Sequence, residues 1–286
     1  MSYPSANNTS LNSELYANLV TAAQFAAYEQ SIARQLVTVF DAPLNTGLNL
    51  QVPVWSSVSA QLITDESVAT VRNTDTTSAT ITLKEHVVYH QVTDQLRDSA
   101  YSNVFAQIGD QSGRAIAESM DSQVFTTFGD FTTDLGSSGH ELVVADLLAA
   151  AATLRSRKLT GPFYAVVHPG AAYNLKKQLS TPAYYSGGYV ANPSDIGNSI
   201  LSGFYIGTVA GIQIFESSLV PTSSTDSTAA VFVPGAIGHA MRGSVEMNTL
   251  YLPANRATDV VLKSVAGASA IQTGFGVKIT CDKQIN

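Results

Sequence analysis

Residues 62–83 read LITDESVATVRNTDTTSATITL, and this stretch departs most clearly from an ordinary globular pattern. Apolar and polar residues alternate on both sides of a polar centre at residues 73–77. Alternation with a period of two is typical of strands, so the stretch predicts a long β-hairpin with its turn at that centre. A lone two-stranded hairpin is only marginally stable in water. Because its apolar residues are sparse, we expect it to reach away from the body and to lean on another surface.

A long helix is predicted soon after the hairpin, over residues 91–128. Its apolar residues follow multiples of four: Val92, Leu96, Val104, Ile108, Ile116, Met120, Val124 and Phe128. A helix of about 35 residues would be roughly 50 Å long, and no proline interrupts the segment. Gly109 and Gly113 permit a bend or a close approach. A coiled coil is the alternative, but the period is nearer four than three and a half, and charged e/g pairs are missing.

Toward the N-terminus, the pattern predicts an arm, a helix and a strand. Residues 1–12 are polar, and residues 15–39 carry apolar residues at helical spacing. Val52, Val54 and Val58 have the spacing of a strand. This part of the chain is therefore expected to lead from a polar arm into the hairpin.

Toward the C-terminus, a glycine- and serine-rich linker at residues 132–139 predicts a domain boundary. Helices and strands alternate beyond it. Helices are expected over residues 141–158 and 171–179, short strands over 163–167, 208–209, 212–215 and 230–233, and long closing strands over 257–266 and 270–281. Residues 181–198 have no period, and loops of that length in compact proteins are usually functional or in contact with partners.

The composition favours a protein whose surface is covered by neighbours. Of 286 residues, 13% are charged and 45% are hydrophobic. Interfaces are depleted of charge, because an unpaired buried charge is costly. The net charge of −7 disfavours nucleic-acid recognition. The densest basic run, residues 155–158, lies where a helix should end, and cations there complement the helix dipole.

Neither a membrane segment nor an intrachain disulfide is expected. Cys281 is the only cysteine. Residues 1–10 lack the basic and apolar regions of a signal peptide. The most apolar helical stretch, residues 142–154, is interrupted by Asp146 and is too short to span a bilayer. We therefore expect a protein made and used in soluble form.

Two residue patterns invite a binding-site interpretation, and neither holds. His86 and His90 are four residues apart and could share a helix face as metal ligands, but no zincin-type glutamate stands between them. Gly203, Gly207 and Gly211 match neither the dinucleotide fingerprint nor a phosphate-binding loop. No metal and no cofactor is therefore expected.

Nucleophilic residues likewise lack the context of an active site. Residues 136–139 read GSSG but lack the spacing of a nucleophile elbow. Cys281 lies in a predicted strand and is expected to be a packed small side chain. His140, His168 and His239 are expected near a helix start, in a turn and in a loop. The sequence thus predicts no enzyme and no catalytic residue.

The order of the predicted elements resembles the major capsid protein fold of tailed bacteriophages, which encapsulins and herpesvirus floor domains share. Residues 62–83 are similar to the extended loop of that fold, and residues 91–128 to its spine helix. Four shorter motifs follow the same order: VVHP at 166–169, GTVAGIQI at 207–214, FVPGA at 232–236 and GFGVKI at 274–279.

This resemblance implies an α+β fold with four regions. They are an N-terminal arm (1–50), an extended loop (51–90), a peripheral domain with the spine helix and long strands (91–131 and 255–286), and an α/β axial domain (132–254). It further implies a structural subunit that self-assembles into pentamers and hexamers of an icosahedral phage head enclosing double-stranded DNA. The implied location is the virion, with assembly in the cytoplasm of the bacterial host.

The implied partners are further copies of the chain, and also scaffolding, portal and cement proteins. Packaged DNA would lie near the subunit without sequence-specific contacts, and no membrane would be involved. An encapsulin-type shell around a cargo enzyme is the alternative within the same fold. A secreted β-rich adhesin or surface-layer subunit is the alternative from another class, which the predicted long helix and the missing signal peptide disfavour.

The sequence departs from many relatives in two ways. The chain leaves no room for a scaffolding extension of about a hundred residues, so we expect a separate scaffolding protein or none. Some relatives join subunits through a Lys–Asn bond, and Lys84 lies at the base of the predicted loop. Neither the asparagine nor the acidic catalyst of such a bond can be assigned from the sequence.

Overall fold

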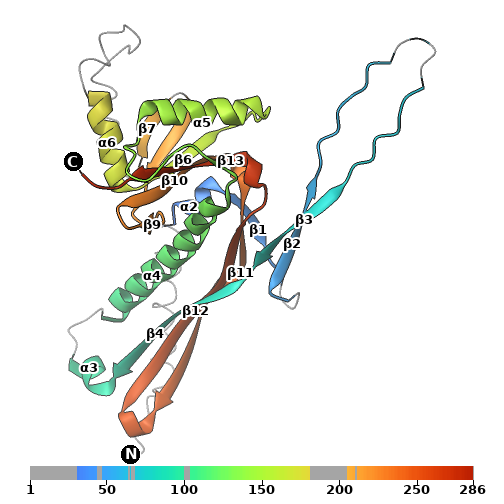
Figure 1. Ribbon diagram of the computed structural model, residues 1–286. Helices are drawn as coiled ribbons and strands as arrows, with labels where there is room; N and C mark the ends of the chain where they lie inside the picture. Colours follow the sequence, from blue (N-terminus) through green and yellow to red (C-terminus); the bar gives the residue numbers. More distant parts are fainter. Residues whose placement is uncertain are drawn as a thin grey trace, which may run out of the picture.

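The computed structural model describes residues 31–43, 47–63, 65, 68–99, 104–180, 205–209 and 211–285. Its helices are α2 (Ala33–Leu36), α3 (Asp94–Ser99), α4 (Val104–Thr126), α5 (Val144–Ser156) and α6 (Pro169–Ser180). Its strands are β1 (Thr38–Asp41), β2 (Asn49–Trp55), β3 (Thr76–Thr82), β4 (Lys84–Thr93), β5 (Thr133–Asp134), β6 (Phe163–Val167), β7 (Tyr205–Val209), β8 (Ile212–Glu216), β9 (Thr222–Ser223), β10 (Asp226–Phe232), β11 (Ile237–Leu252), β12 (Ala257–Ala270) and β13 (Gly276–Asp282). Two sheets form the body, and the two-stranded ribbon β2–β3 projects from it (Figure 1).

The first sheet has seven strands, in the order β5-β13-β10-β6-β8-β7, with β9 paired to β10. Its central strand β6 reads FYAVV, a continuous apolar run of the kind found where both faces of a sheet are covered. Ala165 and Val167 belong to one buried cluster with residues of α5 and α6. Val166 points the other way, into a second cluster with Phe128 and Phe232. Helices therefore cover both faces of this sheet.

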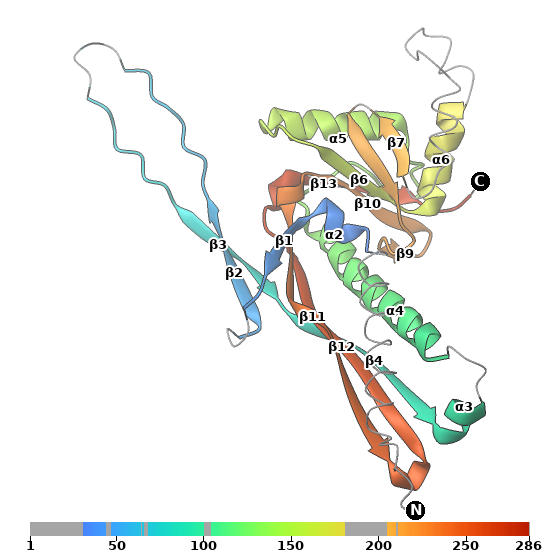
Figure 2. The same ribbon diagram turned by 180° about the vertical axis from the view of Figure 1, so that it is seen from behind.

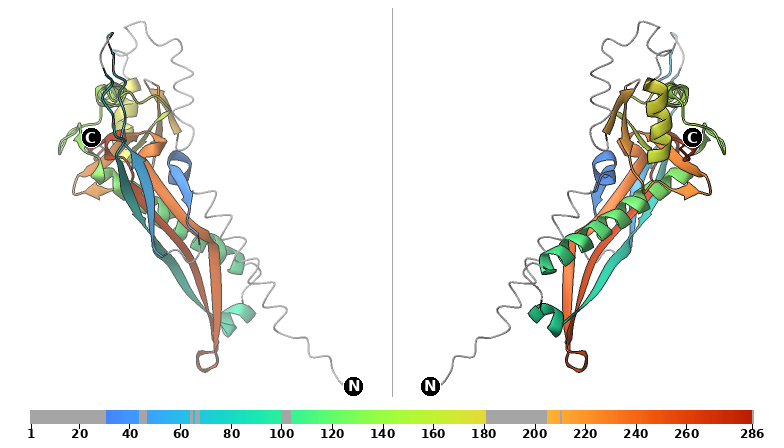
Figure 3. Two further views of the ribbon diagram at one scale, coloured as in Figure 1. Left: turned by 90° about the vertical axis from the view of Figure 1, so that its right-hand side faces the viewer. Right: turned by 90° about the vertical axis from the view of Figure 1, so that its left-hand side faces the viewer.

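The second sheet has four strands, in the order β1-β11-β12-β4. Strands β11 and β12 are long and antiparallel, and their register shifts between Arg242 and Glu246. Helix α4 lies along one face, where its Ile116 is buried with Val260 and Leu262 of β12 (Figure 3). The opposite face carries no helix in the described part of the chain.

The segment formed by α2 and β1 lies where the two sheets meet (Figure 2). Strand β1 pairs in parallel with the start of β11. Leu36 is buried in the same cluster as Phe128 of η1 (Thr127–Asp130), Phe232 of β10 and Ile237 of β11. This cluster joins elements of both sheets, so the segment helps to fix one sheet against the other.

The ribbon exists as predicted, but its strands are not where the alternation placed them. The predicted turn at residues 73–77 is wrong, because Thr76 and Thr77 are paired with Trp55 and Val54. The partner of β3 is thus β2, which lies before the alternating stretch. Alternation reports the local backbone state of a strand and cannot show which segment supplies its hydrogen bonds.

The long helix is shorter than predicted. Residues 91–93 end strand β4, α3 follows, and α4 begins at Val104. The cause is an ambiguity of spacing: a separation of four fits a period of two as well as a period of 3.6. Val88 and Val92 therefore share one face of a strand while matching a helical pattern.

Several further expectations differ from the structure or lie outside the described residues. Strand β11, expected in the axial domain, pairs with β12, whereas β13, expected in the peripheral domain, pairs with β10. Residues 132–139 were expected to be a linker, but β5 lies there and pairs with β13. Val39, expected to end a helix, lies in β1. Residues 1–30 and 181–204, with the predicted arm and long loop, are outside the described residues.

Candidate assembly surfaces

The projecting ribbon and the residues between its strands carry large apolar side chains that the subunit leaves uncovered. They are Trp55, Val58, Leu62, Ile63, Val68 and Val71. Leu62 is 99% exposed and Val68 is 93% exposed. Single exposed apolar residues are common on soluble proteins, but a series of them on one projecting segment marks a contact surface.

The paired strands of the ribbon are closed at their outer end by hydrogen bonds and are anchored to the body at their inner end. The N–H of Ser56 donates to the carbonyl oxygen of Asp75 (3.0 Å), and the N–H of Asp75 donates to Ser56 Oγ (3.2 Å). Closer to the body, Ile81 and Leu83 are buried in a cluster with Ala240 of β11. The anchor therefore lies at Ile81 and Leu83, at the end of β3, and the described residues beyond Ser56 and Asp75 add no buried apolar side chain to the core.

The uncovered face of the four-stranded sheet is a second surface with apolar side chains. Val87 and Tyr89 of β4 are 52% and 55% exposed, and Leu250 of β11 is 63% exposed. Polar cross-strand pairs lie between them, including the ion pair of Lys263 with Glu246 (3.1 Å). These exposed apolar side chains make this face a second candidate contact surface.

The other face of the four-stranded sheet, which α4 covers, contacts this helix through two histidines of β4. His86 Nδ1 lies 2.7 Å from Ser119 Oγ, and its Nε2 lies 3.2 Å from Gln123 Oε1. Since the amide oxygen can only accept, Nε2 carries the proton in the neutral ring and Nδ1 accepts from the serine. Burial lowers the pKa of His86, which favours this neutral form.

His90 of β4 also contacts α4. Its Nε2 lies 3.0 Å from the Oγ of Ser112, which itself donates to the carbonyl oxygen of Ile108 (2.6 Å). The two histidines therefore lie on one face of a strand and bind helix side chains. In the part of the chain that the structure describes, no three His, Cys, Asp or Glu residues gather as metal ligands.

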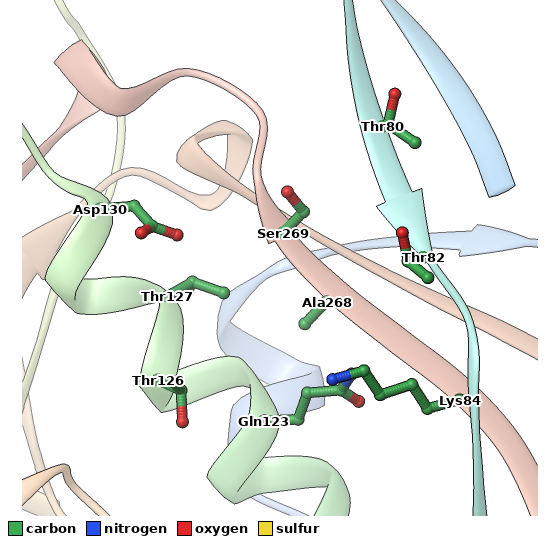
Figure 4. Close-up of a pocket in the computed structure, with 9 residues that line it drawn as sticks. All are labelled: Thr80, Thr82, Lys84, Gln123, Thr126, Thr127, Asp130, Ala268 and Ser269. Atoms are coloured by element: carbon green, nitrogen blue, oxygen red, sulfur yellow. The ribbon is translucent and has the colours of Figure 1, made fainter.

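A polar cleft of about 380 Å³ lies between the ribbon base, the C-terminal end of α4 and β12 (Figure 4). Lys84 lines it from β4, with Gln123 and Asp130 from the α4 side. Figure 4 shows Asp130 at the far end of the cleft from Lys84. Lys84 thus lies at the ribbon base, as expected from the sequence.

The remaining histidines and the cysteine have local structural environments. His140 Nε2 lies 2.8 Å from Asp146 Oδ2, which also accepts from the N–H of Val143 at the start of α5. His168 Nδ1 accepts from the N–H of Gly170 at the start of α6 (3.2 Å). Cys281 is fully buried, and burial raises the pKa of its thiol. None of these groups faces a nucleophile–base arrangement among the described residues.

The glycine, serine and arginine motifs are also structural. The N–H of Gly139 donates to Asp226 Oδ1 (3.0 Å), which fastens the GSSG motif to β10. Gly211 has φ +83°, as the turn between β7 and β8 requires. Arg155 stacks over Phe163 (5.7 Å from guanidinium carbon to ring centroid), and Arg157 donates to Thr133 Oγ1 (2.6 Å). The basic run thus packs on the sheet; Gly203 lies outside the described residues.

One structural group was missed in the sequence. Asp121 of α4 is 3% exposed and accepts from Ser31 Oγ (2.6 Å) and from the N–H groups of Ile32 (2.9 Å) and Ala33 (3.4 Å). Burial raises the pKa of its carboxyl. An acidic residue inside the apolar stripe of a helix was the available signal, because a buried carboxylate needs partners.

None of the described helices has the length and apolar character needed to cross a bilayer.

Comparisons with known proteins agree with this arrangement. Residues 76–282 match the family described as phage capsid protein. No curated protein sequence matches the chain significantly. The match to the family spans the ribbon strand β3, helix α4, the whole seven-stranded sheet with β13, and every strand of the four-stranded sheet except β1.

Solved structures with the same fold come from several sources. A chain of Mycobacterium phage Che8 has a TM-score of 0.68 at 16% identity, covering 87% of this chain and 91% of that one. The capsid of cyanophage P-SCSP1u gives 0.65 at 17% identity, covering 87% of both chains. A virus-like particle from Pyrococcus furiosus gives 0.60 at 14% identity, covering 92% of this chain and 98% of that one.

The expected α+β capsid fold is therefore confirmed, and the family match gives no support to a secreted adhesin or surface-layer subunit. At identities of 14–17%, the TM-scores of 0.60 to 0.68 show that this chain and these solved structures share a fold. The chain belongs to the phage capsid protein family and is a structural subunit of a viral shell.

Proposed function

We propose that the chain assembles into pentamers and hexamers, which together form an icosahedral phage head around double-stranded DNA. The observation that carries this proposal is the ribbon, whose exposed apolar residues from Trp55 to Val71 have no core of their own. A contact between unlike surfaces of identical subunits closes into rings when the rotation permits. A ribbon that covers a neighbour would then bind subunits together.

The regions proposed for this shell follow the sheets rather than the sequence boundaries. The peripheral domain comprises α4 and the four-stranded sheet, and thus includes β11 as well as β12. The axial domain comprises the seven-stranded sheet with α5 and α6, and thus includes β13. Residues 51–90 keep the role of an extended loop, although β4 at its end belongs to the peripheral sheet. Residues 1–50 keep the role of an arm.

We propose no enzymatic activity. His86 and His90 hydrogen-bond to α4, His140 and His168 lie at the starts of α5 and α6, and the thiol of Cys281 is buried beside Ser227. The net charge of −7 would limit adhesion to packaged DNA. Scaffolding, portal and cement proteins are the proposed partners besides further copies of the chain. The subunit would be assembled in the cytoplasm of the bacterial host.

A second candidate is a nanocompartment shell of the encapsulin type around a cargo enzyme. The match to the virus-like particle from Pyrococcus furiosus favours it, with 98% of that chain covered. Isolation of intact particles and analysis of their contents separates the two: DNA supports the phage head, and a single enzyme supports the compartment.

The role of the ribbon can be tested by shortening it without damage to its base. Residues 57–74 are replaced by a short Gly/Ser linker, which keeps the Ser56–Asp75 closure and the buried Ile81 and Leu83. Loop length costs little stability, so the subunit should melt cooperatively and keep its helix content. Closed shells should fail to form or should fall apart on dilution.

A full-length control separates loop contacts from loop length. The variant Leu62→Ser/Val68→Ser/Val71→Ser removes three exposed apolar side chains and keeps every residue of the loop. It should weaken shells as the short linker does. Stable shells from both variants would show that the ribbon plays no part in assembly.

A further inference from the structure

The segment from Ser31 to Asp41 is docked at the junction of the two sheets by its buried Ala33, Leu36 and Val37 and by a small number of polar contacts. Asp121 of α4 holds its first residues, as described above. Thr38 Oγ1 donates to the carbonyl oxygen of Pro234 (3.0 Å), and β1 adds a short parallel edge to β11. Short edge strands and helices of one turn have little stability of their own. The docking of this segment therefore depends on the groups beneath it.

One of those groups is His239 of β11. It stands opposite Val39 of β1 in the parallel register and opposite Ala268 of β12. Its side chain is 2% exposed, and its Nδ1 is buried without a hydrogen-bond partner among the described residues. A buried polar atom without a partner is costly and needs an explanation. The ring nevertheless tolerates burial, because its neutral form carries no charge.

The charges around His239 all oppose its protonation. Burial is the largest cause, followed by the guanidinium of Arg34 on α2 and by His86 on β4, and together they lower the pKa of His239 to about 4. Lys84 adds positive charge beside His86. Asp121 of α4 faces Ser31 at the start of the segment, and Asp41 of β1 is exposed.

We propose that His239 makes the docking of residues 31–41 sensitive to acid: protonation of its buried ring beside Arg34 expels the segment from the junction while both sheets stay folded. This acid response would be a property of the single subunit and does not depend on the geometry of any shell. The released state would expose His239 to water, where the charged ring is solvated and no longer lies beside Arg34 of the released segment.

The direction follows from linkage. The pKa of His239 is lower in the docked state than in the released state, so a falling pH favours release. The effect begins as the pH falls below the ordinary histidine pKa of 6.5, and it is complete below about 4. The difference between the two values corresponds to at most about a 300-fold shift toward release, if the ring is fully solvated after release. Asp121 acts in the opposite sense, because its raised pKa means that the docked state holds a proton more readily. The net shift is therefore smaller than this limit.

Hydrogen exchange measured by mass spectrometry on the full-length subunit tests the proposal. Peptides covering residues 31–41 are compared with peptides of β13 at about pH 7 and about pH 4.5, after correction for the intrinsic exchange rate. The wild-type segment should lose about tenfold or more of its protection at the lower pH, whereas β13 should not. His239→Gln, which cannot become charged, should keep the segment protected at both values.

Three further variants make the result specific. His239→Leu replaces His239→Gln if the amide does not fold. His168→Gln changes a histidine outside the junction and should respond to acid as the wild type does. Asp121→Asn should lower the protection of the segment at both pH values, but the further loss of protection at the lower pH should remain.

Three outcomes would overturn the proposal. The first is equal protection of the wild-type segment at both pH values. The second is a loss of protection in His239→Gln as large as in the wild type. The third is simultaneous loss of protection in β13, because that would show unfolding of the whole subunit rather than release of one segment.

Discussion

Gly267 of β12 lies directly against the backbone of Thr82, at the point where the ribbon enters the body. A Cβ at position 267 would overlap the carbonyl oxygen of Thr82 and lie 3.1 Å from the Cα of Leu83. The neighbouring N–H of Leu83 donates to the carbonyl oxygen of Leu48 (2.8 Å), so the backbone of Thr82 and Leu83 cannot move freely. Only a residue without a side chain permits this approach. The origin of the ribbon is therefore set by a glycine far away in the sequence.

The first prediction tests this contact with Gly267→Ala. The added methyl group must displace backbone, which should destabilise the subunit by about 1–3 kcal/mol. Gly235→Ala is the matched control, since a Cβ there meets no atom within 4 Å. Thermal melting should show a lower Tm for Gly267→Ala alone. Equal melting of the two variants would mean that the backbone at Thr82 yields without cost.

The second prediction concerns the face of α4 that packs on the sheet. Ile116 is 1% exposed and buried with Val260 and Leu262. Ile116→Asp leaves an uncompensated charge there, and it should cost about 3–5 kcal/mol. The neighbouring Ala115 is exposed, so Ala115→Asp should melt close to the wild type. A cooperatively folded Ile116→Asp variant with wild-type Tm would contradict the assignment of this face to the core.

The third prediction concerns Cys281. Its side chain is fully buried beside Ser227 (Sγ to Oγ 3.5 Å), and burial raises the pKa of the thiol. Because the thiolate is the reactive form, the folded subunit should not react with a thiol reagent at neutral pH. Denatured protein should react with one equivalent of the reagent per chain, since the sequence contains one cysteine. Rapid stoichiometric reaction of the folded subunit would show that β13 opens easily.

The sequence predicted the elements between residues 141 and 180 well, because their patterns are local. The strand FYAVV at Phe163–Val167 and the helices that flank it lie where composition and period placed them. The ribbon and α4 were predicted in kind, but one strand of the ribbon lies earlier in the chain and α4 begins later than predicted. In both cases the missing information was a long-range partner: β2 for β3, and β12 for β4.

The contacts that position the surfaces could not be predicted from the sequence. Gly267 meets Thr82, and Asp121 meets Ser31, across separations that no local pattern reports. His86 and His90 gave the right signal of two side chains on one face, but a strand produces it as well as a helix does. Only the described fold shows that they bind α4.

The central claim is that this chain builds a closed shell, and electron microscopy of the purified full-length protein tests it most directly. The protein is expressed alone and together with its scaffolding protein, if one exists, and particles are isolated by size. The account predicts hollow icosahedral particles with fivefold and sixfold clusters of subunits and with the ribbon of each subunit lying on a neighbour. A strictly monomeric protein at high concentration, in every salt and also with the scaffold present, would contradict it.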